Sequence, residues 1–214
     1  MSDVLTTATM TGNKIFEITQ PWYKHDTPIK LGESPIYRES DSTLHWVDFV
    51  DQPCKLYVLP IDATTTDPLG PARVVEIINN EYISVIRFRK DKHGSYVCAC
   101  SRGIGYLNEH TGEVQMVQEL VTAEEHERGL GLNDGGVDPQ GRFWVGGLDL
   151  KILQSRLAGS PAPEGGWIGR SKLWVFDGKE CRAVLSGVIC GNGLGWSPNG
   201  QSCMSELERF SPSY

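Results

Sequence analysis

The sequence of 214 residues has no run of about 20 apolar residues, the length that a membrane-spanning helix needs. It also has no cluster of lysine and arginine, and its 27 acidic residues outnumber its 20 basic residues, for a net charge of −7. Such a surface repels phosphate backbones, so we expect no nucleic-acid partner and no membrane partner. The N-terminus lacks a basic segment followed by an apolar core, so no secretory signal is predicted.

Several motifs of catalysis and metal binding are also missing. There is no GxSxG nucleophile elbow, no Walker loop and no GxGxxG fingerprint. Six cysteines are scattered without the CxxC pairs of zinc sites. Cys98 and Cys100 alternate on a predicted strand, so they share one face and cannot easily form a disulfide with each other. We therefore expect reduced thiols and a cytoplasmic protein.

Helical periodicity is almost absent, and short aromatic and β-branched segments take its place. Most are bounded by Gly, Pro, Asp or Asn, and the chain has 24 Gly and 12 Pro. This pattern predicts an all-β protein with strands at Leu44–Phe49, Lys55–Leu59, Ile83–Arg87, Ser95–Ala99, Arg142–Gly146 and Lys172–Phe176. Two segments are expected to be loops, Val117–Gly129, whose acidic end is also compatible with a helical turn, and the Gly/Pro-rich Gly159–Gly169.

A turn repeats along the chain at intervals of about 50 residues, the length of one blade of a β-propeller. Asp91–Gly94, Asp138–Gly141 and Ser197–Gly200 each begin with Asp or Ser and end with Gly, the composition of a type I turn. Glu39–Ser42 is a degenerate fourth copy. Four copies imply roughly four blades; the alternative is a β-sandwich with similar hairpins.

Three longer motifs occur in a fixed order along the chain. They are Leu31–Pro35 (LGESP), followed by a strand with Trp46, then Leu132–Gly146 (LNDGGVDPQGRFWVG) and Gly191–Gly200 (GNGLGWSPNG). Together they resemble the gluconolactonase/senescence-marker-protein (regucalcin-like) family, from about Ile29 to Gly200. The resemblance implies a six-bladed β-propeller, of which this chain would hold roughly four blades. It divides the chain into an N-terminal extension (1–28), a partial propeller (29–200) and a divergent tail (201–214).

The resemblance implies that Glu33 and Asn192 are ligands of a divalent cation. Hard oxygen donors favour Ca²⁺, Mg²⁺ or Mn²⁺, and family members also accept Zn²⁺; we expect Ca²⁺ first. Asn133 and Asp134 match substrate-side positions, where the amide would hydrogen-bond sugar hydroxyls and the carboxylate would lie near the cation and its water. From the residues alone, Glu33 is equally a solvated loop carboxylate, and the two Asn-containing pairs are equally turn residues.

The sequence also departs from the family pattern. Gly131 stands where the family has a substrate-binding Arg, with Arg128 nearby but out of register. Lys151 stands where an acidic substrate contact is expected, and Asp149 is the nearest carboxylate. No residue matches the Asp that serves the family as third ligand and general acid/base, about one blade (about 50 residues) after Asn192. We read the tail, with its poor strand pattern, as a truncation or an altered reading of a longer gene, and the catalytic residue stays unassigned.

The implied function is divalent-metal-dependent hydrolysis of a sugar lactone, and we expect it to be impaired in this chain, which we read as truncated. The cation would polarise the ring carbonyl and lower the pKa of a water, and a carboxylate would move the proton to the leaving hydroxyl. We expect the oxygens of Glu33 and Asn192 within about 6 Å of each other, a separation that one shared cation allows. The alternative function is a non-catalytic propeller fragment that acts as a metal- or protein-binding module.

Overall fold

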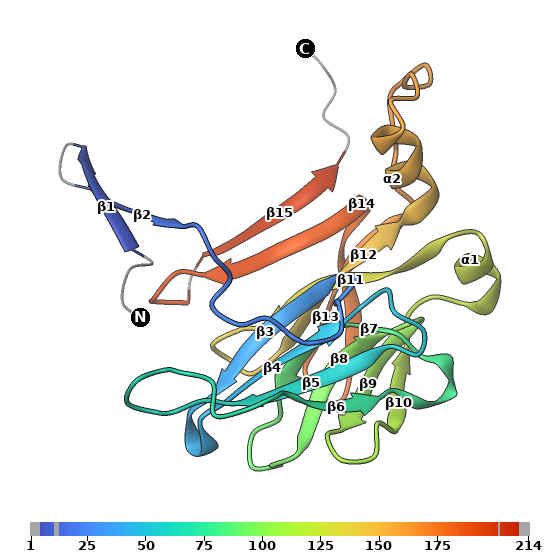
Figure 1. Ribbon diagram of the computed structural model, residues 1–214. Coiled ribbons are helices and arrows are strands. Elements are labelled where there is room, and N and C mark those ends of the chain that lie inside the picture. Colours follow the sequence, from blue (N-terminus) through green and yellow to red (C-terminus); the bar gives the residue numbers. More distant parts are fainter. Residues whose placement is uncertain (1–4, 11–12, 201, 210–214) are drawn as a thin grey trace.

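Antiparallel β-strands are the main regular secondary structure of the protein (Figure 1). The structure, a computed structural model, describes residues 5–10, 13–200 and 202–209. Three sheets follow one another along the chain, and within each sheet consecutive strands are neighbours. The predicted all-β class is confirmed.

The sheets are built from strands of four to sixteen residues. The first contains β3 (Gly32–Arg38), β4 (Thr43–Asp48), β5 (Lys55–Pro60) and β6 (Arg73–Glu76). The second contains β7 (Ile83–Phe88), β8 (Ser95–Cys100), β9 (Gly103–Asn108) and β10 (Val114–Glu119). The third contains β11 (Leu130–Val137), β12 (Phe143–Asp149), β13 (Ser171–Phe176), β14 (Cys181–Trp196) and β15 (Cys203–Arg209).

The remaining elements are short. β1 (Leu5–Met10) and β2 (Asn13–Ile18) form a hairpin that lies apart from the three sheets in Figure 1. The helices are α1 (Ala123–Glu127) and α2 (Leu150–Leu157), with 3₁₀ turns at Glu39–Asp41 and Ile78–Asn80.

The repeated turn occupies the same place in each repeat. Its four copies join β3 to β4, β7 to β8, β11 to β12 and β14 to β15. In the third copy the Asp138 carboxylate accepts hydrogen bonds from the backbone N–H groups of Gln140 (3.0 Å) and Arg142 (2.9 Å), as a turn-closing Asp does. The predicted repeat is thus confirmed. The count of roughly four blades is not, because the described residues form three sheets and the β14–β15 pair extends the third.

Two local predictions were wrong, and one helix was missed. Val117–Gly129 is not mainly a loop, because it contains the end of β10 and then α1, the helical turn that its acidic end allowed, which starts with a capping box between Thr122 and Glu125. Helix α2 was not predicted; the Asp149 side chain caps its first turn. The tail pairs as β15 with β14 despite its poor pattern, because β14 presents an edge whose backbone groups need partners.

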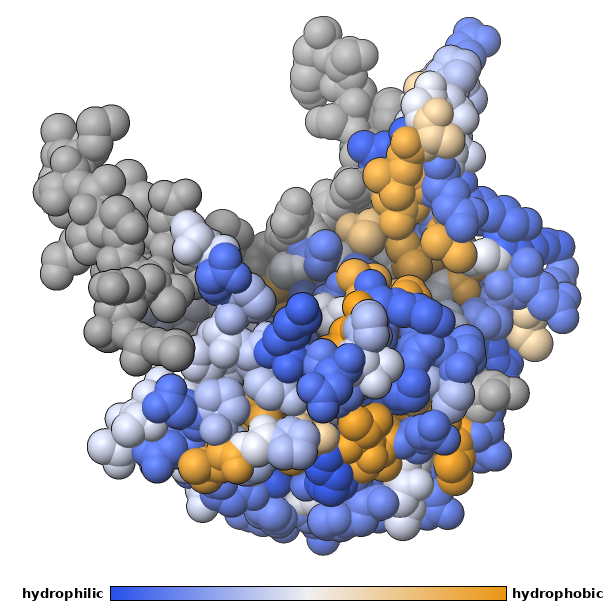
Figure 2. Space-filling model, in the orientation of Figure 1, coloured by the Kyte–Doolittle hydropathy of each residue, from blue (hydrophilic) through white to orange (hydrophobic). Residues whose placement is uncertain are grey.

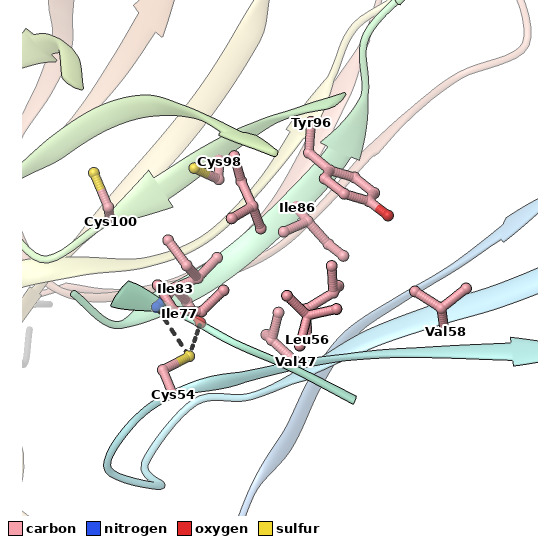
Figure 3. Packing of buried hydrophobic residues seen from close by; sticks show 12 residues of the cluster. Val47, Cys54, Leu56, Val58, Ile77, Ile83, Ile86, Tyr96, Cys98 and Cys100 are labelled. Carbon is pink, nitrogen blue, oxygen red and sulfur yellow. Dashed lines mark hydrogen bonds between the residues drawn. The ribbon is translucent and has the colours of Figure 1, made fainter. Parts of the chain in front are cut away.

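Two apolar clusters join the three sheets. One packs Val47 and Leu56 of the first sheet against Ile83, Ile86 and Tyr96 of the second (Figure 3). The other packs residues of the second sheet against residues of the third. Cys98 and Cys100 belong to the same buried cluster, as their predicted shared face requires, and no cysteine among the described residues forms a disulfide.

The exposed surface is mainly hydrophilic, with apolar patches (Figure 2). Leu150 and Leu157 of α2 and Ile168 in the following segment are exposed. Within the described residues, no helix has the length and apolar character to span a membrane.

A buried carboxylate links the first two sheets at the far end of β3 from Glu33. Glu109, whose side chain is 3% exposed, accepts from Arg38 (2.6 Å), Arg73 (2.8 Å) and the Tyr96 hydroxyl (2.8 Å). Burial alone would raise the pKa of Glu109, but the hydrogen bonds from Arg38 and Tyr96 outweigh it and lower this pKa to about 2. Glu109 is therefore ionised and fully paired.

We expect Glu109→Gln to lower the free energy of unfolding by about 3–5 kcal/mol, because it leaves two arginines without a buried counter-charge. Urea unfolding at pH 7 measures this. The matched control is Glu119→Gln, which removes an exposed partner of Arg102 and should cost less than about 1 kcal/mol. Equal small effects of the two substitutions would show that the Glu109 network does not stabilise the fold.

The stabilisation by Glu109 should disappear in acid. Its pKa is lowered by folding, so its contribution is complete above its ordinary pKa of 4.5 and is lost as pH falls toward about 2. The difference in unfolding free energy between wild type and Glu109→Gln should therefore be constant above about pH 5 and shrink below it. A difference that stays constant down to pH 3 would contradict the assigned pKa.

Candidate functional site

Four strand segments from the three sheets contact one another, and we call them the inner strands: β3, β7, β11 and the C-terminal half of β14. β3 contacts β7, β7 contacts β11, and β11 contacts β14. Each inner strand has an irregularity in register: between Glu33 and Ile36 in β3, Ile83 and Val85 in β7, Leu132 and Gly135 in β11, and Asn192 and Leu194 in β14. Bulges of this kind redirect side chains and are frequent beside active sites.

The predicted site residues lie at these irregularities, within strands. Glu33 is not the loop carboxylate of the alternative interpretation, and Asn192 also lies within a strand, because their backbones pair with Val47 of β4 and Glu206 of β15. Irregular pairing lets a strand carry a polar residue toward a neighbouring sheet without ending the strand.

Glu33 is half-buried and lies near a second carboxylate. Burial raises the pKa of Glu33, and the negative charge of Asp134 on β11 raises it further. The next residue, Ser34, is buried and has a left-handed backbone conformation (φ 56°), which is costly for a residue with a Cβ. Its hydroxyl compensates by bonding both the N–H (2.9 Å) and the carbonyl (3.1 Å) of Ile86 on β7.

Asn133 and Asp134 connect β11 to β14. The Asn133 side-chain amide donates to the Gly191 carbonyl (2.9 Å), and the backbone carbonyl of Asn133 accepts from the Ser84 hydroxyl (2.6 Å). The Asp134 carboxylate accepts from Gly135 N–H (2.7 Å) and from Gly193 N–H (3.1 Å). Asp134 therefore bonds the backbone of its own strand and that of β14 at Gly193, so the Asn133–Asp134 pair does not act only within its own segment.

Glycine is required where β14 passes β12. A Cβ on Gly146 would lie 2.7 Å from the Gly191 Cα, and a Cβ on Gly191 would lie 2.6 Å from the Gly146 Cα. This close approach of two backbones places the Gly191 carbonyl beside Asn133. Asn192 follows directly and its side chain is exposed.

Arg87 is a site residue that the sequence reasoning missed. It is in β7, and its guanidinium lies 3.9 Å from the Asp134 carboxylate. Burial lowers the pKa of Arg87, and the charge of Asp134 partly opposes this effect. The sequence contains a signal for it, a charged residue at the end of the mainly apolar segment ISVIR, but the pattern of that segment predicts only a core strand.

The residues at the departures from the family pattern have structural partners. A Cβ on Gly131 would lie 3.1 Å from the Tyr82 hydroxyl, so that oxygen occupies space in front of the glycine. Asp149 is buried and accepts from Arg170 at 2.7 Å through both oxygens. Arg128 pairs with Glu124 at 2.5 Å. Asp149 is thus committed to a structural role and does not replace the acidic substrate contact.

The donors at the inner strands suit a hard cation. Glu33, Asp134 and Asn192 offer carboxylate and amide oxygens. Burial raises the pKa of Glu33, the negative charge of Asp134 raises it further, and a bound cation would offset both effects. Among the described residues, no group of three His, Cys, Asp or Glu side chains is arranged to hold a metal ion, so an amide such as that of Asn192 is needed to complete a ligand set.

Residues 31–205 match the SMP-30/gluconolactonase/LRE-like region. A 6-deoxy-6-sulfogluconolactonase of Pseudomonas putida is 29% identical over 174 residues, which are 80% of this chain and 50% of that protein. A regucalcin of Xenopus laevis is 32% identical over 123 residues, which are 58% of this chain and 36% of that protein.

Solved structures show the same fold at low sequence identity. A calcium-binding protein, regucalcin, from Agrobacterium tumefaciens superposes with a TM-score of 0.60 at 19% identity, covering 81% of this chain and 49% of the other. A luciferin-regenerating enzyme superposes with a TM-score of 0.57 at 21% identity, covering 81% and 51%. The chain spans about half the length of the P. putida relative and of these two structures. The match over residues 31–205 confirms the predicted resemblance, and the chain belongs to the SMP-30/gluconolactonase/LRE-like family.

Proposed function

We propose that this protein hydrolyses sugar lactones with the help of a divalent cation, Ca²⁺ in the first place. Its main support is that Asp134 bonds the Gly193 N–H, directly beside Asn192, that its charge acts on Glu33 of another sheet, and that all three residues lie at irregularities of the inner strands. Membership of a family that includes a 6-deoxy-6-sulfogluconolactonase supports the lactone, and a relative called a calcium-binding protein supports the cation.

Glu33 and Asn192 would hold the cation, with Asp134 close by. Hard oxygen donors without Cys or His favour Ca²⁺, and Mg²⁺, Mn²⁺ and Zn²⁺ are the other candidates. A divalent cation supplies polarisation of a carbonyl oxygen and a lowered pKa for a water.

The chain's own side chains would orient the sugar. The Asn133 side-chain amide already donates to the Gly191 carbonyl, and this bond fixes the orientation of its NH2 group. The second N–H of that group would donate to a substrate hydroxyl. Asp134, held by two backbone N–H groups, is an acceptor for a water or a hydroxyl. We assign the general acid/base to none of the described residues, and the sugar stays undefined because Gly131 and Lys151 replace two of the family's substrate contacts.

Ca²⁺ should raise the melting temperature of the wild-type chain, and Glu33→Gln should abolish most of this rise. A ligand at 100 times its Kd stabilises a folded protein by about 2.7 kcal/mol. Without Ca²⁺ the variant should be at least as stable as wild type, because the raised pKa of Glu33 means that its charge is unfavourable in the folded state.

The matched control for this thermal-shift measurement is Glu39→Gln, at an exposed carboxylate beyond the other end of β3. It should leave the effect of Ca²⁺ unchanged. An equal Ca²⁺ effect in wild type and Glu33→Gln would exclude Glu33 as a ligand.

Asn133→Ala should raise KM for an aldonolactone several-fold to about tenfold, because it removes one hydrogen bond to a sugar hydroxyl. The measurement is release of acid from gluconolactone in the presence of Ca²⁺. Ser84→Ala is the control, since it removes the hydroxyl that bonds the backbone carbonyl of Asn133 and leaves the side-chain amide of Asn133 in place. Ca²⁺ binding without lactone turnover in wild type would instead favour a non-catalytic metal-binding module.

A further inference from the structure

Arg87 bonds to residues directly beside both carboxylates of the site. One terminal nitrogen donates to the Ser34 hydroxyl (2.7 Å) and to the Ile86 carbonyl (2.7 Å). The other donates to the Gly135 carbonyl (2.5 Å). Ser34 follows Glu33 on β3, and Gly135 follows Asp134 on β11.

The two attachment points are backbone irregularities that need support. Ser34 has its left-handed conformation at the register shift of β3, and Gly135 ends the register shift of β11. A Cβ on Gly135 would lie 2.2 Å from the Trp144 carbonyl oxygen, so this segment of β11 is closely packed against β12. One planar guanidinium therefore connects the two segments that carry the carboxylates, across all three sheets.

The chemistry of the side chain matters as well as its charge. Arginine presents several N–H donors in a rigid plane, whereas lysine has one nitrogen on a flexible stem. The side chain of Arg87 is only 26% exposed, and its bonds to Ser34 and Gly135 diverge from two different nitrogens. The single ammonium nitrogen of a lysine cannot occupy the positions of both guanidinium nitrogens at once, so it would not reproduce both bonds.

We propose that Arg87 is a positioning residue that sets the gap between the Glu33 and Asp134 carboxylates by holding Ser34 on β3 and Gly135 on β11. This inference rests on the proposed cation site. Arg87 touches neither the cation nor the sugar; it acts through the two backbone segments.

The direction in which a neutral residue at position 87 changes the Ca²⁺ affinity separates this role from a purely electrostatic one. A guanidinium 3.9 Å from Asp134 repels a cation bound there, so a role of charge alone predicts tighter Ca²⁺ binding when Arg87 is made neutral. A positioning role predicts weaker binding, because the carboxylates would no longer be held at the separation that a cation requires.

The test is calorimetric titration of Ca²⁺ into the whole 214-residue chain, below its melting temperature, for wild type, Arg87→Met, Arg87→Lys and Arg89→Met. We expect at least a tenfold loss of affinity for both Arg87 variants. Arg89, which stacks on Tyr106 and bonds Ser95, is the matched control and should bind Ca²⁺ as wild type does.

Equal or tighter binding by Arg87→Met would overturn the proposal, as would wild-type affinity in Arg87→Lys, which keeps the charge and loses the planar donors. If Arg87→Met does not fold, Arg87→Lys decides alone. Hydrogen exchange at the Ile86 and Gly193 amides, which bond Ser34 and Asp134, should accelerate in the Arg87 variants and not in Arg89→Met. A wild-type chain that binds no Ca²⁺ would overturn the cation site itself, and this inference with it.

Discussion

Regular antiparallel strands alternate their side chains between two faces, so a regular ladder cannot direct two neighbouring residues to the same place. In β3, β11 and β14 the ladder is interrupted at the residues that form the site, and in β7 it is interrupted at Ser84, which bonds Asn133. The interruption in β11 turns Asn133 and Asp134 toward β14, and that in β3 places Glu33 near Asp134. The site is therefore a product of local departures from regular pairing in strands that contact one another across the three sheets.

These departures carry a cost that hydrogen bonds between the sheets offset. Ser34 is strained, and two carboxylates approach each other with partial burial. Three arginines join the first sheet to the second: Arg87 through Ser34 at the site, and Arg38 and Arg73 through buried Glu109 at the other end of β3. A strand held at both ends retains its irregular middle, which explains why the site lies on strands and not on mobile loops.

Sequence reasoning predicted the features that local chemistry determines. The turn copies were visible because Asp, Ser and Gly have fixed positions in a type I turn, and the family followed from three motifs in order. The contacts between inner strands were not visible, because nothing in ISVIR shows that its Arg reaches Ser34 and Gly135 in other sheets. The strand at 203–209 was missed for a related reason, since its pairing depends on the edge offered by β14 and not on its own pattern.

The binding of one divalent cation by Glu33 and Asn192 beside Asp134 can be observed directly in an anomalous difference map from crystals of the protein soaked with Mn²⁺, an oxygen-preferring substitute for Ca²⁺. We expect one strong peak in contact with the Glu33 carboxylate and the Asn192 side-chain oxygen. A strong peak elsewhere, with none between these residues, would contradict it.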